Sequence, residues 1–298
     1  MIKKFKILAA LAVCFININP SVLTYGQALA NCDKLNLKIQ KPGSDGCIQT
    51  LNKKGEVSEA FDYAMRKFLI FSKGKRVLEI GGCYGDVMLL ALKKSEATKY
   101  VLSDLDERHV FIAAKCLYKK IKQNWLDPKS SNQVEFVQAD VTNTLQIQKL
   151  GQYDVIYVGN VFHLLTPEQF ELAVNNLFLL LKPKGRIYVT AFSPYLKPYK
   201  DFIPEYKKNA KAGEKYPGFI KSLGNYVNSD GPIPISIKNM LGDPFFSLDV
   251  KTLRGKFQDN GFKVLECKYV PFSHKSRLWS YDGREYVIII AEKEAAPE

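Results

Sequence analysis

The sequence predicts an α/β fold with a mostly parallel, seven-stranded sheet, helices on both faces of the sheet and an antiparallel last strand. Short apolar segments alternate with amphipathic segments along most of the chain, as in sheets whose strands are joined by crossover helices. The 298 residues are 46% hydrophobic and 24% charged, a composition that allows one sizeable core and indicates a folded protein rather than a disordered one.

The first thirty residues have the pattern of an export signal. Lysines near the start precede an apolar run from Ile7 to Ile18, and Ala28-Leu29-Ala30 is a small-x-small pattern that a signal peptidase accepts. The apolar run is short for a bilayer crossing, which needs about 20 residues. We expect residues 1–30 to be a cleaved signal peptide of an exported protein. A membrane anchor and a cytoplasmic leader are the alternatives.

The charge balance is basic. The formal net charge is +13, and the chain without its leader would carry +10. Such a balance suits an anionic partner, but the lysines are spread along the chain rather than clustered. Nucleic-acid binding is therefore not indicated, and membrane contact is expected only through the leader.

The cysteines offer no metal site, because none of them has CxxC spacing. Cys32 and Cys47 flank a polar, glycine-containing stretch that follows the proposed leader. An exported protein could close a short disulfide loop there. Two unpaired thiols are the alternative.

Residues 31–57 are polar, contain turn-forming residues and are expected to be an extended segment. The main domain is expected over residues 58–298, with Ser58 as the N-cap of its first helix. Further helices are predicted at Asp86–Lys94, Arg108–Trp125, Thr166–Leu181 and Val250–Asn260. The expected strands are Arg76–Ile80, Tyr100–Ser103, Val134–Val137, Asp154–Val158, Ile187–Thr190, Phe262–Cys267 and Tyr286–Ala291.

The regular alternation stops between residues 194 and 247, where prolines, aromatic residues and lysines replace it. A short helix is expected around Lys207, Lys208 and Lys211. Because the segment follows a parallel strand, we expect a lid-like insertion at the carboxyl edge of the sheet, where it would cap or shape a pocket.

A glycine-rich turn follows the first predicted strand and includes Gly81, Gly82 and Gly85. Glycines there let the backbone approach a ligand closely. In a nicotinamide-binding pattern, Asp86 would occupy the third glycine position, and its charge would repel a pyrophosphate. A ligand that carries a positively charged sulfonium and no phosphate would be attracted by a nearby acid rather than repelled. Glu79 could then hold its cationic end.

Two further strand ends carry acids. Asp104 lies about 20 residues beyond the glycine turn and is placed to accept hydrogen bonds from both hydroxyls of a ribose, with Leu105 over the adenine. Asp140 can accept from the adenine amine, and the Val141 amide can donate to a ring nitrogen. Three acids at three successive strand ends indicate one nucleoside-containing ligand.

These motifs resemble the class I S-adenosylmethionine-dependent methyltransferase family, which has a Rossmann-like fold. The resemblance covers approximately Val57 to Ala291, with the insertion excepted. The matching motifs are Glu79–Gly85, Asp104, Asp140-Val141, Tyr153–Asn160 and Leu180–Arg186.

The resemblance implies S-adenosylmethionine as the cofactor. Glu79, Gly81 and Gly85 would shape the pocket for its methionine end, and Asn160 would form the wall beside the methyl group. Asp104 would bind the ribose, and Asp140 and Val141 would bind the adenine. The family usually has a glycine where this chain has Cys83, and a side chain there narrows the loop.

Methyl transfer from a sulfonium is an in-line displacement that depends mainly on proximity and orientation, so a general base is not always needed. His163, three residues beyond Asn160, is the candidate for taking a proton or orienting a nucleophile. Local packing of this histidine is the alternative. His109 and His274 are expected at the surface.

Two other functions are compatible with the sequence. Ile80-Gly81-Gly82 resembles the start of the aminopropyltransferase motif, but that chemistry needs an Asp where this chain has Gly159-Asn160. A non-catalytic exported binding or effector protein on the same fold is the second, because the leader directs the chain to a compartment poor in the cofactor. The methyl acceptor, small molecule or macromolecule, is not indicated by the sequence.

Overall fold

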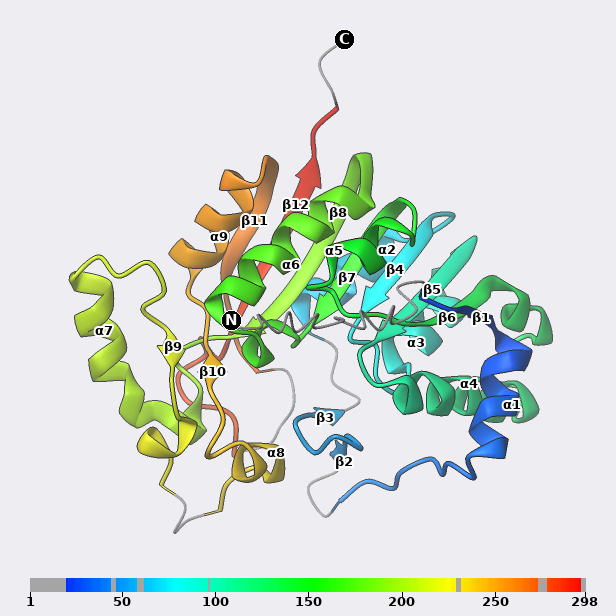
Figure 1. The fold of residues 1–298 in the computed structure, drawn as a ribbon, viewed down its shortest axis with the longest axis horizontal. Coiled ribbons are helices and arrows are strands. Elements are labelled where there is room, and N and C mark those ends of the chain that lie inside the picture. Colours follow the sequence, from blue (N-terminus) through cyan, green and yellow to red (C-terminus); the bar gives the residue numbers. More distant parts are fainter. Residues whose placement is uncertain are drawn as a thin grey trace, which may run out of the picture.

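The structure is a computed structural model that describes residues 20–43, 47–57, 62–95, 97–228, 232–272 and 278–295. A single eight-stranded sheet runs through the described part with the order β1-β6-β5-β4-β7-β8-β12-β11 (Figure 1). Its strands are β1 (Val22–Thr24), β4 (Arg76–Ile80), β5 (Lys99–Asp104), β6 (Val134–Gln138), β7 (Tyr153–Gly159), β8 (Leu181–Phe192), β11 (Phe262–Val270) and β12 (Tyr286–Lys293).

The sheet confirms the predicted fold class. Strands β4 to β8 pair in parallel, whereas β12 pairs antiparallel with both β8 and β11. All seven predicted strands lie within observed ones. The eighth strand, β1, was not predicted, and it pairs antiparallel with β6, with Val22 opposite Val137.

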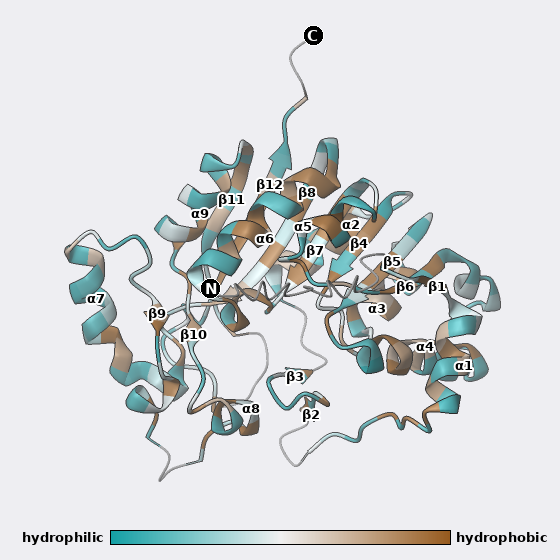
Figure 2. Cartoon of the chain, in the orientation of Figure 1, coloured by the Kyte–Doolittle hydropathy of each residue, from teal (hydrophilic) through white to brown (hydrophobic). Residues whose placement is uncertain are grey.

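Helices cover both faces of the sheet because successive strand residues point to opposite sides. Val77 and Val155 belong to the core beneath α1 (Tyr25–Lys34), α2 (Tyr63–Phe71), α3 (Asp86–Lys94) and α4 (Glu107–Lys122). Leu78 and Ile156 belong to the core beneath α5 (Thr144–Gln148), α6 (Pro167–Leu180) and α9 (Val250–Asp259). Figure 2 shows the central strands as predominantly hydrophobic.

Helix α1 is part of the folded domain. Thr24 and Gln27 form a capping box at its start, Ala28 and Cys32 are fully buried, and Asp33 pairs with Lys115 of α4 at 2.9 Å. The predicted boundary at residue 30 therefore falls inside a packed helix. Residues 1–19 of the predicted leader lie outside the described part. Cys32 is a buried thiol, with its Sγ atom 3.8 Å from the Leu37 carbonyl, so the disulfide loop to Cys47 is not formed.

Helix α2 begins at Tyr63 and is capped by Asp62, which accepts a 2.7 Å hydrogen bond from the Met65 amide. The predicted N-cap, Ser58, lies outside the described residues. Asp62 was missed because serine and aspartate are both good N-caps, and the two stand four residues apart.

The insertion contains η3 (Lys197–Phe202), α7 (Ile203–Lys211), β9 (Phe219–Ile220), η4 (Leu223–Tyr226), α8 (Ile235–Asn239) and β10 (Phe245–Phe246). Helix α7 is the predicted lysine-bearing helix, and Figure 2 shows it as largely hydrophilic. The insertion lies at the end of the sheet where the parallel strands finish, on the same side as the short hairpin of β2 (Ile48–Gln49) and β3 (Glu56–Val57) (Figure 1). Within the described residues, no helix combines the length and the apolar character that a membrane span needs.

Candidate cofactor-binding site

The glycine-rich turn connects β4 to α3 and needs its glycines. Gly81 has φ +71°, and a Cβ atom there would lie 2.4 Å from Cγ2 of Val161. Gly85 has φ +84° and is the N-cap of α3. Cys83 adopts φ +45°, a left-handed conformation that favours glycine. The turn thus keeps the backbone geometry of a glycine at Cys83 while adding a side chain.

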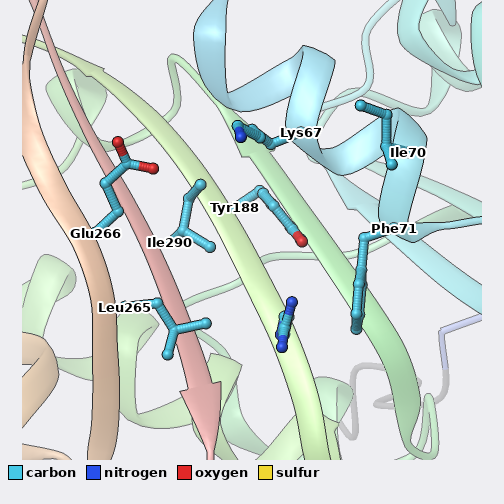
Figure 3. A pocket seen from close by; sticks show the side chains of 8 residues that line it. Lys67, Ile70, Phe71, Tyr188, Leu265, Glu266 and Ile290 are labelled. Atoms are coloured by element: carbon cyan, nitrogen blue, oxygen red, sulfur yellow. The ribbon is translucent and has the colours of Figure 1, made fainter.

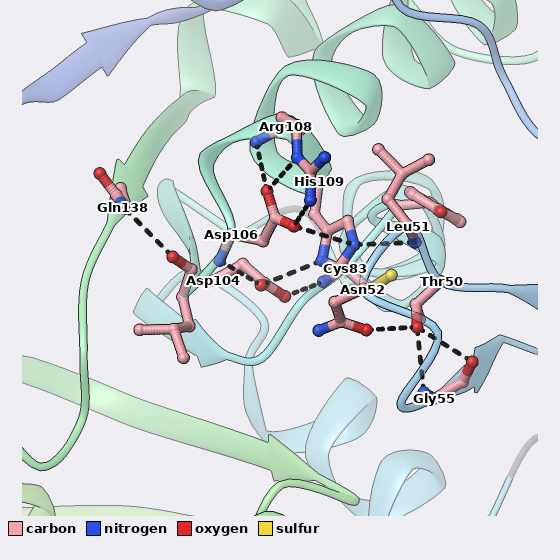
Figure 4. Close-up of polar contacts among 12 residues, drawn as sticks. Thr50, Leu51, Asn52, Gly55, Cys83, Asp104, Asp106, Arg108, His109 and Gln138 are labelled. Carbon is pink, nitrogen blue, oxygen red and sulfur yellow. Dashed lines mark hydrogen bonds and ion pairs between the residues drawn. The ribbon is translucent and has the colours of Figure 1, made fainter. Parts of the chain in front are cut away.

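Asp104 ends β5 beside this turn, and internal hydrogen bonds hold its carboxylate (Figure 4). Oδ2 accepts from the Cys83 amide at 2.9 Å, and Oδ1 accepts from the Asp106 amide at 3.0 Å. Nδ1 of His109 lies 3.1 Å from Oδ1. The predicted ribose acid is therefore joined directly to the glycine turn.

His109 was expected at the surface, and that expectation is wrong: its side chain is 2% exposed. Asp106 caps α4, and the first turn of this helix brings His109 back toward the end of β5. The sequence did contain a signal for this position. His109 lies in the first turn of α4, and the N-cap of this helix, Asp106, stands two residues beyond the end of β5. His274 lies outside the described residues.

Glu79 lies beneath the glycine turn rather than at its surface. It is buried, and it accepts a 2.8 Å hydrogen bond from the hydroxyl of Tyr100. Burial raises the pKa of Glu79 to about 8, and the nearby charges of Asp86 and Asp104 act in the same direction. The described hydrogen-bond partners of the Glu79 carboxyl are the Tyr100 hydroxyl of β5 and the Met88 amide of α3.

Asp140 and Val141 follow β6, next to the end of β5. Oδ1 of Asp140 accepts from both the amide and the hydroxyl of Thr142, and the buried Val141 is held through its carbonyl by Asn176. Leu105, whose side chain must reach a ligand ring in the predicted arrangement, is 65% exposed. The structure thus brings the predicted ribose and adenine residues to two adjacent strand ends.

Asn160 follows β7 with φ +53°, and its side-chain amide lies 3.5 Å from the hydroxyl of Tyr286. Within the described residues, Oδ1 of Asn160 is buried and has no hydrogen-bond partner. A buried acceptor of this kind is costly unless a ligand or water supplies a donor. Oδ1 of Asn160 is therefore an acceptor, at the end of β7, that no described protein group fills.

His163 lies in 3-10 helix η2 (Phe162–Leu164), buried against the rings of Phe192 and Phe245 at centroid distances of 4.8 and 5.1 Å. Burial lowers the pKa of His163 to about 3. An imidazole with so low a pKa is a poor proton acceptor. These contacts favour the packing alternative for this residue.

Asp62 is a further acidic residue beside β7, and the sequence patterns did not indicate it. It is buried, its Oδ2 atom accepts from the Tyr157 hydroxyl at 3.1 Å, and burial raises its pKa. Tyr157 lies on β7, two residues before Gly159. The only signal in the sequence was its position before a helix that leads into the first parallel strand.

A groove with a volume of about 380 Å³ lies between α2 and strands β8, β11 and β12 (Figure 3). Among its lining residues are Phe71, Arg186, Tyr188 and Glu266. None of the residues of the glycine turn or of the β5 and β6 ends takes part in it, so it is separate from the candidate cofactor site.

Residues 78–187 match a family profile described as a methyltransferase domain. The matched segment is similar to a methyltransferase domain and covers the central strands of the sheet. It contains the glycine turn, Asp104, Asp140 and Asn160. Among curated proteins, no sequence matches the chain.

The chain is similar to solved structures. An S-adenosylmethionine-dependent methyltransferase from Methanosarcina mazei is 14% identical and superposes with a TM-score of 0.54, covering 80% of this chain and 100% of that one. An O-methyltransferase family protein from Burkholderia thailandensis is 12% identical, with a TM-score of 0.47 and coverage of 80% of this chain. This chain spans 55% of the length of the Burkholderia protein.

The profile match indicates methyl transfer, and the shared fold is that of an S-adenosylmethionine-dependent methyltransferase. The residues present suit S-adenosylmethionine. Gly81 has no room for a side chain, Asp104 offers hydrogen-bond acceptors, and the exposed Leu105 offers an apolar surface.

Proposed function

We propose that this protein transfers the methyl group of S-adenosylmethionine in line to a nucleophile bound on the side of the insertion. The observation that carries the proposal is the joining of Asp104 to the glycine turn through the Cys83 amide, beside the exposed Leu105. This arrangement offers polar groups for a ribose and an apolar surface for a base within a few residues.

The bound cofactor would supply the activated methyl group, and the protein's residues would bind and orient. Asp104 would hold the ribose, the strand ends at Leu105 and Asp140 would hold the adenine, and the Gly81 turn would allow close approach of the methionine end. The unpartnered Oδ1 atom of Asn160 would accept a hydrogen bond beside the reacting groups. No residue is required as a base when the nucleophile is already deprotonated.

The acceptor would enter from the insertion side. The insertion stands at the carboxyl edge of the sheet, and the residue that follows it is tied to β8, where the Leu248 amide donates to the Phe192 carbonyl at 2.8 Å. Segments at this edge shape the ligand sites of open α/β sheets. The proposal covers both small-molecule and macromolecular acceptors.

A transfer assay tests the proposal. The full chain would be incubated with methyl-labelled S-adenosylmethionine and with separated small-molecule, lipid, protein and nucleic-acid fractions of the source cells. We expect label in one fraction with the wild type and a loss of about tenfold or more with Asp104→Ala. Asp259→Ala, an exposed residue at the end of α9 outside the insertion, is the matched control and should label as the wild type does. Equal labelling by wild type and Asp104→Ala would contradict the proposal.

We also propose that the protein is exported and that its leader ends before β1. This boundary is supported by the packing of β1 on β6 and of α1 on α4, which cleavage after Ala30 would disrupt. Mass spectrometry of the amino terminus of the protein from its own cells tests it. A mature chain that begins at Asn31 would contradict this boundary, and an intact Met1 would contradict cleavage.

A further inference from the structure

We infer that His109 is a positioning residue of the cofactor site, which fixes the carboxylate of Asp104 and joins it to an N-terminal strap, residues 47–57. The inference rests on the proposed function, because it concerns how the same site recognises the ribose. It assigns a role to a residue that belongs to none of the motifs of the glycine turn or of the strand ends.

The two ring nitrogens of His109 have different partners. The Leu51 amide donates to Nε2 at 3.2 Å, so Nε2 is the acceptor nitrogen. Nδ1 therefore carries the proton and donates to Oδ1 of Asp104 at 3.1 Å. With the ring 2% exposed, both contacts are shielded from water. The histidine thus holds Asp104 in one orientation.

The contacts of Asp104 limit what a ligand can reach. A carboxylate has about four acceptor positions, and the Asp106 amide and His109 both use Oδ1 while the Cys83 amide uses Oδ2. The remaining position is on Oδ2. Asp104 in this orientation is therefore set to accept from one ribose hydroxyl, whereas the sequence pattern alone suggests two.

The strap is attached to the cofactor site at two points. Leu51 contacts His109, and the hydroxyl of Tyr84, in the glycine turn, donates to the Gln49 carbonyl at 3.2 Å. The rings of Tyr84 and His109 also meet edge to face at 5.4 Å. Figure 4 shows the strap at Leu51 and Thr50 beside Cys83 and His109.

The other side of the strap is attached to the insertion. The Ser236 amide donates to Oε1 of Glu56 at 2.7 Å, the Asn239 side chain donates to the Lys53 carbonyl at 3.2 Å, and Lys54 pairs with Asp243 at 3.0 Å. The strap therefore spans from the cofactor site to α8 on the acceptor side. Through Leu51, His109 connects the ribose acid to this span.

Binding measurements on the full chain test the inference. The ligands are S-adenosylhomocysteine and its 2′,3′-dideoxy analogue, and the proteins are the wild type, His109→Leu and His109→Asn. We expect His109→Leu to weaken S-adenosylhomocysteine about tenfold and to leave the dideoxy analogue within about twofold, because the lost orientation matters only to ribose hydroxyls. His109→Asn keeps a donor near the position of Nδ1 and should recover most of the affinity.

The outcomes separate the two proposals. If the folded wild type binds neither ligand, the proposed function fails, and this inference fails with it. If the wild type binds S-adenosylhomocysteine and His109→Leu weakens both ligands equally or neither, only the role of His109 is overturned. Should His109→Leu not fold, His109→Asn and His109→Gln replace it, since the Gln amide extends toward the position of Nε2. Equal affinity for S-adenosylhomocysteine in these two variants would then overturn the inference.

Discussion

Nδ1 of His109 and Oδ1 of Asp104 lie 3.1 Å apart, and the histidine is held on its other side by an amide from residue 51. The acid expected to bind the cofactor is therefore supported by a helix, by the glycine turn and by a segment more than fifty residues earlier in the chain. A ligand site of this kind is sensitive to changes well outside the strand ends that contact the ligand.

The amino-terminal boundary can be tested by truncation. We expect the chain from residue 20 to 298 to melt as the full chain does, whereas the chain from residue 31 to 298 should melt about 5 °C lower or more. The second truncation removes β1 and the buried Ala28, and a loss of 1 kcal/mol lowers the melting temperature of a chain of this size by about 2–4 °C. Equal melting temperatures of the full chain and of the chain from residue 31, measured by calorimetry, would show that β1 and the first turns of α1 contribute nothing to stability.

Two glycines with similar backbone angles separate the cost of conformation from the cost of space. Gly74→Ala, at φ +67° with no atom within 4 Å, should lose about 1 kcal/mol of unfolding free energy. Gly81→Ala has nearly the same φ and also a Cβ clash with Val161, so its loss should be about 3 kcal/mol. Adding Val161→Ala to Gly81→Ala should remove the loss of unfolding free energy that the clash causes. The loss caused by the left-handed backbone conformation at residue 81 should remain. Urea unfolding measures all three variants, and equal losses for the two glycines would refute the close approach.

The buried carboxyl of Glu79 makes stability depend on pH. Its pKa is raised from 4.5 to about 8 in the folded state, so folding favours the protonated form. The corresponding stabilisation is complete below about pH 4.5 and is lost as the pH rises toward 8, at about 1 kcal/mol per pH unit. Glu79→Gln does not titrate and should show a flatter dependence between pH 5 and 8. Parallel curves of unfolding free energy for both proteins would contradict the shifted pKa.

His163 should be dispensable for proton transfer. His163→Phe keeps a ring between Phe192 and Phe245 and removes Nδ1, which is buried and has no partner within the described residues. We expect unchanged or increased stability and a methyl-transfer rate within about twofold of the wild type. A loss of a hundredfold or more, with S-adenosylhomocysteine still bound, would restore the catalytic interpretation.

The sequence predicted the parallel sheet because its central strands are buried on both faces and are therefore rich in apolar residues, such as Val155–Val158 in β7. The predicted strand Arg76–Ile80 matches β4 residue for residue. The sequence patterns missed β1 because Val22-Leu23 and the alanines that follow have the same composition as the end of an export signal. The spacing from β5 was a local signal for His109, but one of its hydrogen-bond partners, the Leu51 amide, is 58 positions away. Local patterns carry no information about such long-range pairs.

The strand ends show the same limit. Glycines and acids at 81, 104 and 140 were found from their order and spacing, since the carboxyl ends of parallel strands meet at one edge. The burial of Glu79 and the occupied acceptor positions of Asp104 depend on Tyr100, Asp106 and Cys83 in three dimensions. Which atoms of a site remain for a ligand is therefore a property of the folded chain.

The most direct test of the central claim is a calorimetric titration of the full chain with S-adenosylmethionine and S-adenosylhomocysteine, with Asp104→Ala and Asp259→Ala alongside. We predict binding by the wild type and by Asp259→Ala, and affinity about tenfold weaker or worse in Asp104→Ala. No heat of binding to the folded wild type, or equal affinity in Asp104→Ala, would contradict a cofactor site at the ends of β4, β5 and β6.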